Sequence, residues 1–250
     1  MSHRFFVEGD TLAPEQCRQI ATVLRLAPGA VVTLVRDGVE LDYRLDRVGR
    51  DEVTGTVVAR RPAAGEPRVA LTLALPLLRG DRSEEVIEAT TQLGVSRFAP
   101  YTSARSVVRE LSAAKRGRWL RIAREAAETA RRGRIPLIDE LRDWPALLAA
   151  LPAPLIVPWE EAREPTLESA LREALGRASG PPAPAAPPAP AAPPATVALS
   201  LVIGPEGGIA AEEIALARGR GARTVTLGLR TLRAETAAIA VVARAIAALE

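Results

Sequence analysis

Two glycine-bearing turns near the end of the chain contain the residue types that could do chemistry. The first, Gly204-Pro205-Glu206-Gly207-Gly208, follows an apolar run from Val197 to Ile203 that is typical of a buried strand. The second begins at Gly228, directly after a short predicted strand over Thr224–Leu227. Because α/β sheets bind ligands at the carboxyl ends of their strands, we expect the two turns to lie side by side and form a binding site.

The composition of the first turn excludes two phosphate-binding motifs. A P-loop needs a lysine after its last glycine, whereas this turn has no lysine and carries Glu206, which repels an anion. It also lacks the Gly-x-Gly-x-x-Gly spacing of a dinucleotide site. Gly207 and Gly208 allow positive φ and leave no side chain between the backbone and a ligand. The turn therefore favours a neutral or cationic ligand, such as a sulfonium cofactor with a nucleoside end, and the alternative is a tight turn without a ligand.

The second turn leads into a predicted helix over Ala237–Leu249 that is apolar on nearly every face. Such a helix is buried, either in the core or at a subunit interface. Glu235 falls in its first turn, where the helix dipole stabilises a carboxylate with or without a ligand. Arg230 and Arg233 precede the helix, and we expect them to meet an anion, an RNA phosphate or a partner subunit.

The elements that must position these turns belong to the second of two regions. Residues 5–60 consist mostly of short strands, with one helix predicted over Pro14–Leu26, and this spacing favours a small β-barrel. From Val69 onwards, apolar strands alternate with helical patterns such as Asp81–Leu93 and Lys115–Ala130. This alternation predicts a mostly parallel sheet covered on both faces.

Two further segments divide the chain. Residues 61–65 are rich in Pro, Ala and Gly and mark a domain boundary. Ser179–Thr196 is a proline and alanine run without periodicity, which we expect to be an exposed insert, either passive or recognised by a proline-binding module.

Composition and charge limit the partners and the location. The 250 residues are 48% hydrophobic and 25% charged, which is ordinary globular material, and the single cysteine, Cys17, excludes an internal disulfide. No signal peptide or membrane span is predicted, so we expect a cytoplasmic protein without a metal site. Between Arg60 and Arg134, sixteen Lys or Arg stand against eight Asp or Glu. That surplus suggests nucleic acid, although the near absence of lysine also fits a bias in genome composition.

Several blocks, in order, resemble one enzyme family. The stretches IGPEGGIAAEEI and VTLGLRTLRAETAA resemble the cofactor-binding signature of the SPOUT (α/β-knot) methyltransferases, and within them the RsmE-type ribosomal RNA uridine-N3 methyltransferases. The resemblance continues upstream and covers nearly the whole chain except the insert; its blocks are Arg4–Val7, Gly80–Arg82, Gln92–Arg97, Arg105–Val107 and Glu125–Glu128.

This resemblance implies a fold and an activity. Residues 1–66 would form a PUA-like β-barrel that binds RNA, and residues 67–250, with the insert 179–196, a trefoil-knotted SPOUT domain with a mostly parallel sheet. The protein would be a homodimer that uses S-adenosylmethionine to methylate N3 of a uridine in 16S ribosomal RNA of the small ribosomal subunit. By position, the cofactor-binding residues would be Gly204, Pro205, Glu206, Gly207, Gly208, Leu227, Gly228, Leu232, Arg233, Glu235 and Thr236.

Removal of the N3 proton leaves negative charge on the uracil oxygens, which a guanidinium would stabilise. Arg233 and Arg4 are the candidates, and Glu206 or Glu235 could accept the proton. The arginines expected to contact RNA are Arg79, Arg82, Arg105, Arg132, Arg134 and Arg230.

The chain departs from the family pattern at Thr129–Arg131, where the family usually has Gln-Ser/Cys-Gly, and at Arg79, where a lysine is usual. Two alternatives stay open. One is a knotted methyltransferase that acts on a ribose 2′-hydroxyl or on guanine N1, and the other is a non-catalytic RNA-binding factor in ribosome assembly.

Overall fold

The computed structural model of the protein describes residues 3–9, 11–178 and 197–249, so the insert Ser179–Thr196 lies outside the described residues. The described chain divides into two compact units. The first contains the residues up to Glu66 together with Ala127–Ile135, and the second contains Pro67–Ala126 and the remainder. Helix α3 (Ala113–Thr129) contributes to both, because its last residues belong to the first unit.

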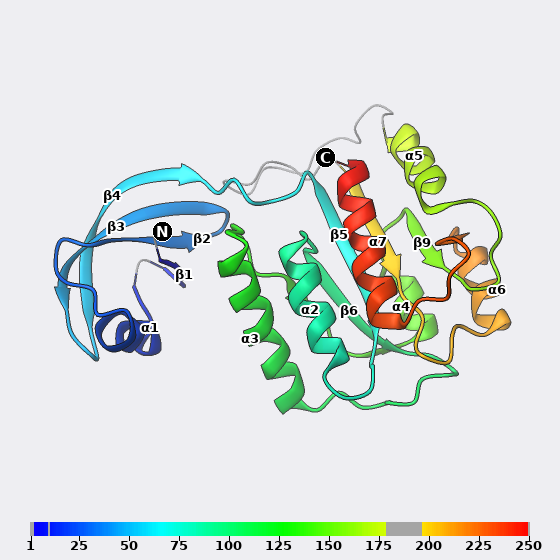
Figure 1. The fold of residues 1–250 in the computed structure, drawn as a ribbon, viewed down its shortest axis with the longest axis horizontal. Helices are drawn as coiled ribbons and strands as arrows, with labels where there is room; N and C mark the ends of the chain where they lie inside the picture. Colours follow the sequence, from blue (N-terminus) through cyan, green and yellow to red (C-terminus); the bar gives the residue numbers. More distant parts are fainter. Residues whose placement is uncertain (1–2, 10, 179–196, 250) are drawn as a thin grey trace. The chain divides into compact units, whose positions relative to one another are not determined.

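The first unit is built on a four-stranded sheet in the order β1-β2-β3-β4 (Figure 1). Only β1 pairs in parallel; β2, β3 and β4 form antiparallel hairpins. The β2–β3 turn is Asp37-Gly38, and both residues have positive φ, which matches the twist of a two-residue hairpin. The bounds are β1 Arg4–Phe6, β2 Val31–Arg36, β3 Val39–Val48 and β4 Val53–Pro62.

The helix expected over Pro14–Leu26 is shorter than predicted. It consists of α1 (Pro14–Arg18) and a π-helical turn, η1 (Gln19–Val23). Arg25 adopts a positive φ of 50°, which ends the helix before Pro28. Ile20 on this segment is fully buried in the core of the first unit, against strand residues such as Leu34 and Leu45.

The second unit is an α/β fold with a parallel sheet in the order β11-β9-β10-β5-β6-β7, and β8 also pairs with β6 (Figure 1). The predicted mostly parallel sheet is therefore confirmed. The strands are β5 Val69–Pro76, β6 Arg97–Thr102, β7 Leu137–Ile138, β8 Arg142–Asp143, β9 Leu155–Pro158, β10 Val197–Val202 and β11 Arg223–Val225.

Helices connect these strands and pack against one another. The helix α7 contacts both α2 and α5, and α4 contacts β6 and α6. Their bounds are α2 Arg82–Gln92, α4 Trp144–Ala150, α5 Leu167–Ala178, α6 Ala211–Gly219 and α7 Ala234–Leu249.

The apolar helix α7 begins at Ala234, three residues earlier than expected, and Glu235 lies in its first turn as predicted. In the single chain only one of its faces is buried, which includes Ala238, Val241, Val242 and Ala245. The core thus accounts for one face, and burial of the rest at a subunit interface stays a prediction. Among the described residues, no helix is both long enough and apolar enough to cross a membrane.

Candidate active site

Three strands of the second unit end at one cavity of about 1020 Å³. Its wall comes from the residues after β9, from the glycine turn after β10 and from the turn after β11. The two glycine turns thus share one cavity, but they do not follow neighbouring strands, because β9 lies between β10 and β11. Consecutive order along the chain does not require adjacency in a parallel sheet, and the predicted meeting of the two turns at one site does not depend on it.

Most of the predicted cofactor-binding residues line this cavity. Those that do are Gly204, Pro205, Glu206, Gly208, Leu227, Gly228, Leu232, Arg233 and Glu235. Gly207 and Thr236 are not part of the lining. The carbonyl of Gly207 instead accepts a hydrogen bond from Arg105 Nη1 at 3.2 Å, and the side chain of Thr236 is exposed.

Backbone geometry explains the glycine at position 208. Its φ is +73°, in the left-handed region that glycine tolerates best. A Cβ at this position would also collide with the carboxylate of Glu160. A hydrogen bond fixes the start of the same turn: the buried Tyr101 hydroxyl donates to the Ile203 carbonyl at 2.5 Å.

Carboxylates form part of the cavity wall. Glu160, Glu206 and Glu235 all contribute to the described lining. Glu206 Oε1 accepts the backbone N–H of Arg79 at 3.1 Å and lies 3.5 Å from Arg82 Nη1. Glu235 Oε2 is buried and has no hydrogen-bond partner in the described structure, so an acceptor stands ready for a ligand donor.

Arginines complement these carboxylates in the same lining; they are Arg82, Arg163, Arg230 and Arg233. Arg230 and Arg233 belong to the exposed turn between β11 and α7. The cavity therefore offers carboxylates to a cation and guanidinium groups to an anion, which is the combination a cationic cofactor and a polyanionic substrate need together.

The sequence reasoning missed the wall that follows β9. Trp159, Glu160 and Arg163 line the cavity, and the Arg218 guanidinium lies 5.2 Å from the centre of the Trp159 ring. No glycine turn follows β9 (Leu155–Pro158), so no local motif indicated a ligand site there. The available signal was its position as one more parallel strand whose carboxyl end reaches the ligand-binding edge.

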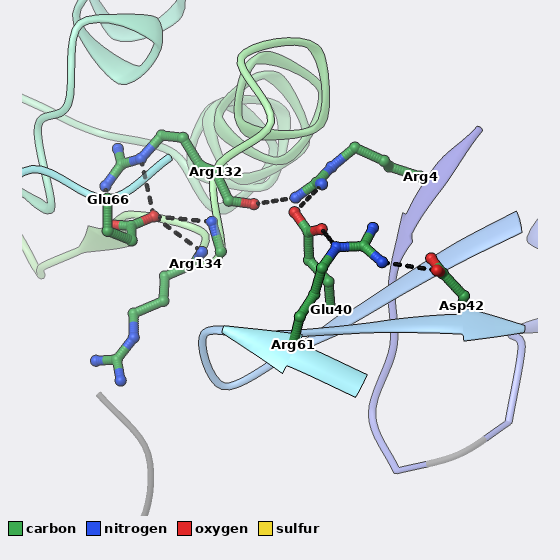
Figure 2. A network of polar contacts seen from close by, with 8 residues as sticks. Arg4, Glu40, Asp42, Arg61, Glu66, Arg132 and Arg134 are labelled. Carbon is green, nitrogen blue, oxygen red and sulfur yellow. Dashed lines mark hydrogen bonds and ion pairs between the residues drawn. The ribbon is translucent and has the colours of Figure 1, made fainter. Parts of the chain in front are cut away.

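Two of the predicted functional arginines lie in the first unit and bind other protein groups (Figure 2). Arg4 forms an ion pair with Glu40 and donates to the Arg132 carbonyl at 2.9 Å, and it does not line the cavity. Its guanidinium is thus occupied in holding the first unit together.

Arg132 corrects a prediction of RNA contact. Its side chain is 1% exposed, and its Nη2 lies 2.8 Å from Glu66 Oε2. The same Glu66 carboxylate accepts the backbone N–H groups of Gly133 and Arg134 (Figure 2). A side chain this buried presents no charge to a phosphate, whereas Arg134 is exposed.

The other predicted RNA-binding arginines lie on the surface of the second unit. Arg79, Arg105 and Arg230 are exposed, and Arg82 is partly exposed at the cavity. Among the residues that the structure describes, no group of three or more His, Cys, Asp or Glu side chains is placed to hold a metal ion.

The fold and the cavity define an α/β protein with a ligand site at the carboxyl edge of a parallel sheet. Residues 65–246 match the sequence model of the RNA methyltransferase domain, and the chain belongs to that family.

Named relatives narrow the comparison. The chain is 29% identical over 236 residues to ribosomal RNA small subunit methyltransferase E of Bacillus subtilis, covering 91% of this chain and 85% of that protein. It is 33% identical over 229 residues to the Mycobacterium tuberculosis protein of the same name, covering 87% of this chain and 78% of that protein. The structure is similar to that of ribosomal RNA small subunit methyltransferase E from Neisseria gonorrhoeae bound to S-adenosyl methionine. That comparison has a TM-score of 0.77 and 26% identity and covers 98% of this chain and 96% of that one.

Proposed function

We propose that this protein transfers the methyl group of S-adenosylmethionine to N3 of a uridine in 16S ribosomal RNA of the small ribosomal subunit. The observation that carries the proposal is that both glycine turns of the sequence signature line one cavity. The named relatives are small-subunit rRNA methyltransferases, and one of them is bound to the cofactor.

The residues of the cavity fit this cofactor. Its sulfonium and ammonium groups are cationic, and the lining offers Glu160, Glu206 and Glu235. Gly208 leaves the backbone open to close approach. Leu227 and Leu232 provide apolar surface for the nucleoside end.

When bound, the cofactor supplies an electrophilic methyl group for in-line transfer. The protein must then position the uracil and stabilise the negative charge that develops on its oxygens. Arg233 and Arg230 line the cavity and are the guanidinium groups suited to that task.

A carboxylate is the candidate proton acceptor. Glu206 already accepts a hydrogen bond from the Arg79 backbone and lies near Arg82. Glu235 retains one oxygen without a partner, which favours it over Glu206 for accepting the N3 proton.

Uridine N3 lies on the Watson–Crick edge, so the target base must be unpaired when it reacts. The exposed Arg79, Arg105 and Arg134, together with Arg82 and Arg230, are proposed to bind RNA phosphates. Both units contribute to this set.

The remaining features are proposed from the family resemblance. Residues 1–66 would form a PUA-like RNA-binding domain and residues 67–250 a trefoil-knotted domain, in a cytoplasmic homodimer. The four-stranded sheet of the first unit supports the PUA-like domain. The half-exposed apolar face of α7 supports the homodimer.

The decisive experiment is incubation with labelled S-adenosylmethionine and small ribosomal subunits that lack the modification, followed by nucleoside mass analysis. We expect 3-methyluridine. A 2′-O-methylated nucleoside or 1-methylguanosine would point to the other enzyme class. If the protein binds RNA but neither binds the cofactor at millimolar concentration nor methylates RNA, the result would match the assembly-factor alternative.

A further inference from the structure

One arginine connects the first glycine turn to the start of α7, the helix that follows the second glycine turn. Arg82, the first residue of α2, lies 3.5 Å from Glu206 through Nη1 and 3.9 Å from Glu235 through Nε. Glu206 belongs to the turn after β10, and Glu235 lies in the first turn of α7, directly after the second glycine turn. Arg82 lines the cavity with both carboxylates, and its side chain is 40% exposed.

The charges at this point conflict with the binding of a cation. A sulfonium cofactor is attracted by Glu206 and Glu235, but the guanidinium of Arg82 lies near both carboxylates, offsets one of their two negative charges and repels a second positive charge. Distances of 3.5 and 3.9 Å describe loose ion pairs rather than short hydrogen bonds. Arg82 can therefore exchange these partners for another anion at low cost, and its exposure leaves it able to reach one.

We propose that Arg82 couples cofactor binding to RNA binding. Without the cofactor, Arg82 pairs with Glu206 and Glu235. With the cofactor present, its positive charge takes over the carboxylates and releases Arg82 to an RNA phosphate. The inference rests on the proposed function and adds to it a residue that makes each ligand strengthen the binding of the other.

Thermodynamic linkage gives the inference a measurable size. If RNA raises the affinity for the cofactor by some factor, the cofactor raises the affinity for RNA by the same factor. Couplings of this kind usually amount to roughly 5- to 150-fold. Since Arg82 is partly exposed, we expect a value near the lower end, about fivefold, which shrinks further as salt is added.

The test measures binding without turnover. The probe is a cofactor analogue in which a protonated amine replaces the sulfonium, so that no methyl group can be transferred. Its dissociation constant is measured by equilibrium dialysis with and without unmodified small ribosomal subunits, for the wild type and for Arg82→Gln.

For the wild type we expect the subunits to tighten binding of the cationic analogue about fivefold. In Arg82→Gln, binding without RNA should become tighter, because the competing charge is gone, and the RNA effect should fall below about twofold. A residue that merely contacted the cofactor would show the reverse, namely weaker binding. Weaker binding, or an RNA effect as large as in the wild type, would overturn the role of Arg82.

Arg79→Gln is the matched control. Arg79 lies three positions away and binds Glu206 through its backbone N–H, which the substitution retains. Removing its charge should weaken RNA binding and leave the coupling factor unchanged. An equal loss of coupling in Arg79→Gln would show a general charge effect and reject the specific exchange.

A measurement on the wild type alone keeps the inference testable if Arg82→Gln does not fold. S-adenosylhomocysteine, whose sulfur is neutral, should show a smaller RNA effect than the cationic analogue. Equal effects would reject the charge exchange. Failure of both ligands to bind at millimolar concentration would instead reject the proposed function itself.

Discussion

The cavity contains side chains of both charges, and each charge suits a different ligand. Glu160 and Glu235 line the cavity that is proposed to bind the cationic cofactor, and Arg230 and Arg233 belong to the turn that is proposed to meet the RNA. Reaction is favoured where both ligands meet, since only there are the opposite charges satisfied together. The substitutions that separate these roles are therefore the sharpest tests at this scale.

Arg233→Ala removes a guanidinium from the cavity wall. Since this charge is proposed to stabilise the uracil oxygens as the proton leaves, we expect kcat/KM for RNA to fall by about 100-fold or more. The affinity for S-adenosylmethionine, measured by calorimetry, should change far less. Arg223→Ala is the control, because Arg223 pairs with Glu173 and does not line the cavity. Near wild-type rates for Arg233→Ala would exclude Arg233 from the mechanism.

Gly208→Ala tests the first turn. The carboxylate of Glu160 can rotate away from a new Cβ, but the φ of +73° cannot be relieved without moving the turn. We expect a cost of about 1–2 kcal/mol for the left-handed conformation, seen either as lower stability or as weaker cofactor binding. The control is Gly219→Ala at the end of α6, where a Cβ meets nothing within 4 Å. Unchanged melting temperature and cofactor affinity in Gly208→Ala would contradict this account of the turn.

At the scale of elements, the position of the first glycine turn depends on a hydrogen bond from strand β6. Tyr101 on β6 is fully buried and donates its hydroxyl to the Ile203 carbonyl at the end of β10. Desolvation by burial, with a smaller contribution from Glu213, raises the pKa of Tyr101 well above its usual value, so the hydroxyl keeps its proton.

Tyr101→Phe retains the ring packing on Trp144 and removes this one hydrogen bond. We expect the free energy of unfolding to fall by about 1–2 kcal/mol and the KM for S-adenosylmethionine to rise. The difference from the wild type should also shrink above about pH 10. There the unfolded tyrosine releases its proton while the folded one does not, so the wild type loses stability as pH rises. Urea unfolding of both proteins at pH 8 and pH 10.5 measures this, and a constant difference would contradict the assigned pKa direction.

The sequence predicted which segments form strands, but it did not predict which strands lie next to each other in the sheet. Long apolar runs such as β5 and β10 were identified because burial on both faces leaves a local signal. The placement of β9 between β10 and β11 depends on long-range pairing, which leaves no such signal in a short segment. For that reason Glu160 was missed. The glycine turns were found, because a turn that requires glycine is visible in the sequence itself.

The same limit explains the errors in assigning charges. Arg132 lies in a basic stretch, so its sequence context predicted a surface cation. Its burial arises from Glu66, which lies 66 positions away and binds it in the folded first unit. An arginine on the surface and an arginine in a buried ion pair look the same in a sequence until the acidic partner is placed.

At the scale of the whole molecule, the chain between the two units has to return to the first unit after α3. The returning segment Ala127–Ile135 is bound by Glu66, which accepts from Arg132, Gly133 and Arg134, and by Arg4, which donates to the Arg132 carbonyl (Figure 2). Phe6, Val35 and Ala127 form a small apolar cluster in the same unit. The first unit is therefore assembled from two separate parts of the chain, and a buried ion pair joins them.

Glu66→Ala should destabilise this unit more than any surface change. It removes the carboxylate that binds the Arg132 guanidinium, which is 1% exposed, and breaking a buried pair costs about 3–5 kcal/mol. Hydrogen exchange should rise in peptides from residues 3–66 and 127–135, while the described cavity residues, all in the second unit, retain cofactor binding. Arg134→Ala is the control, because its side chain is exposed and its backbone N–H still binds Glu66. The double variant Glu66→Ala with Arg132→Met also removes the buried guanidinium and should recover part of the loss, since a well-packed apolar side chain can replace a buried pair. If the double variant is as unstable as Glu66→Ala alone, the loss comes from packing or from the backbone hydrogen bonds to Glu66 rather than from the broken ion pair.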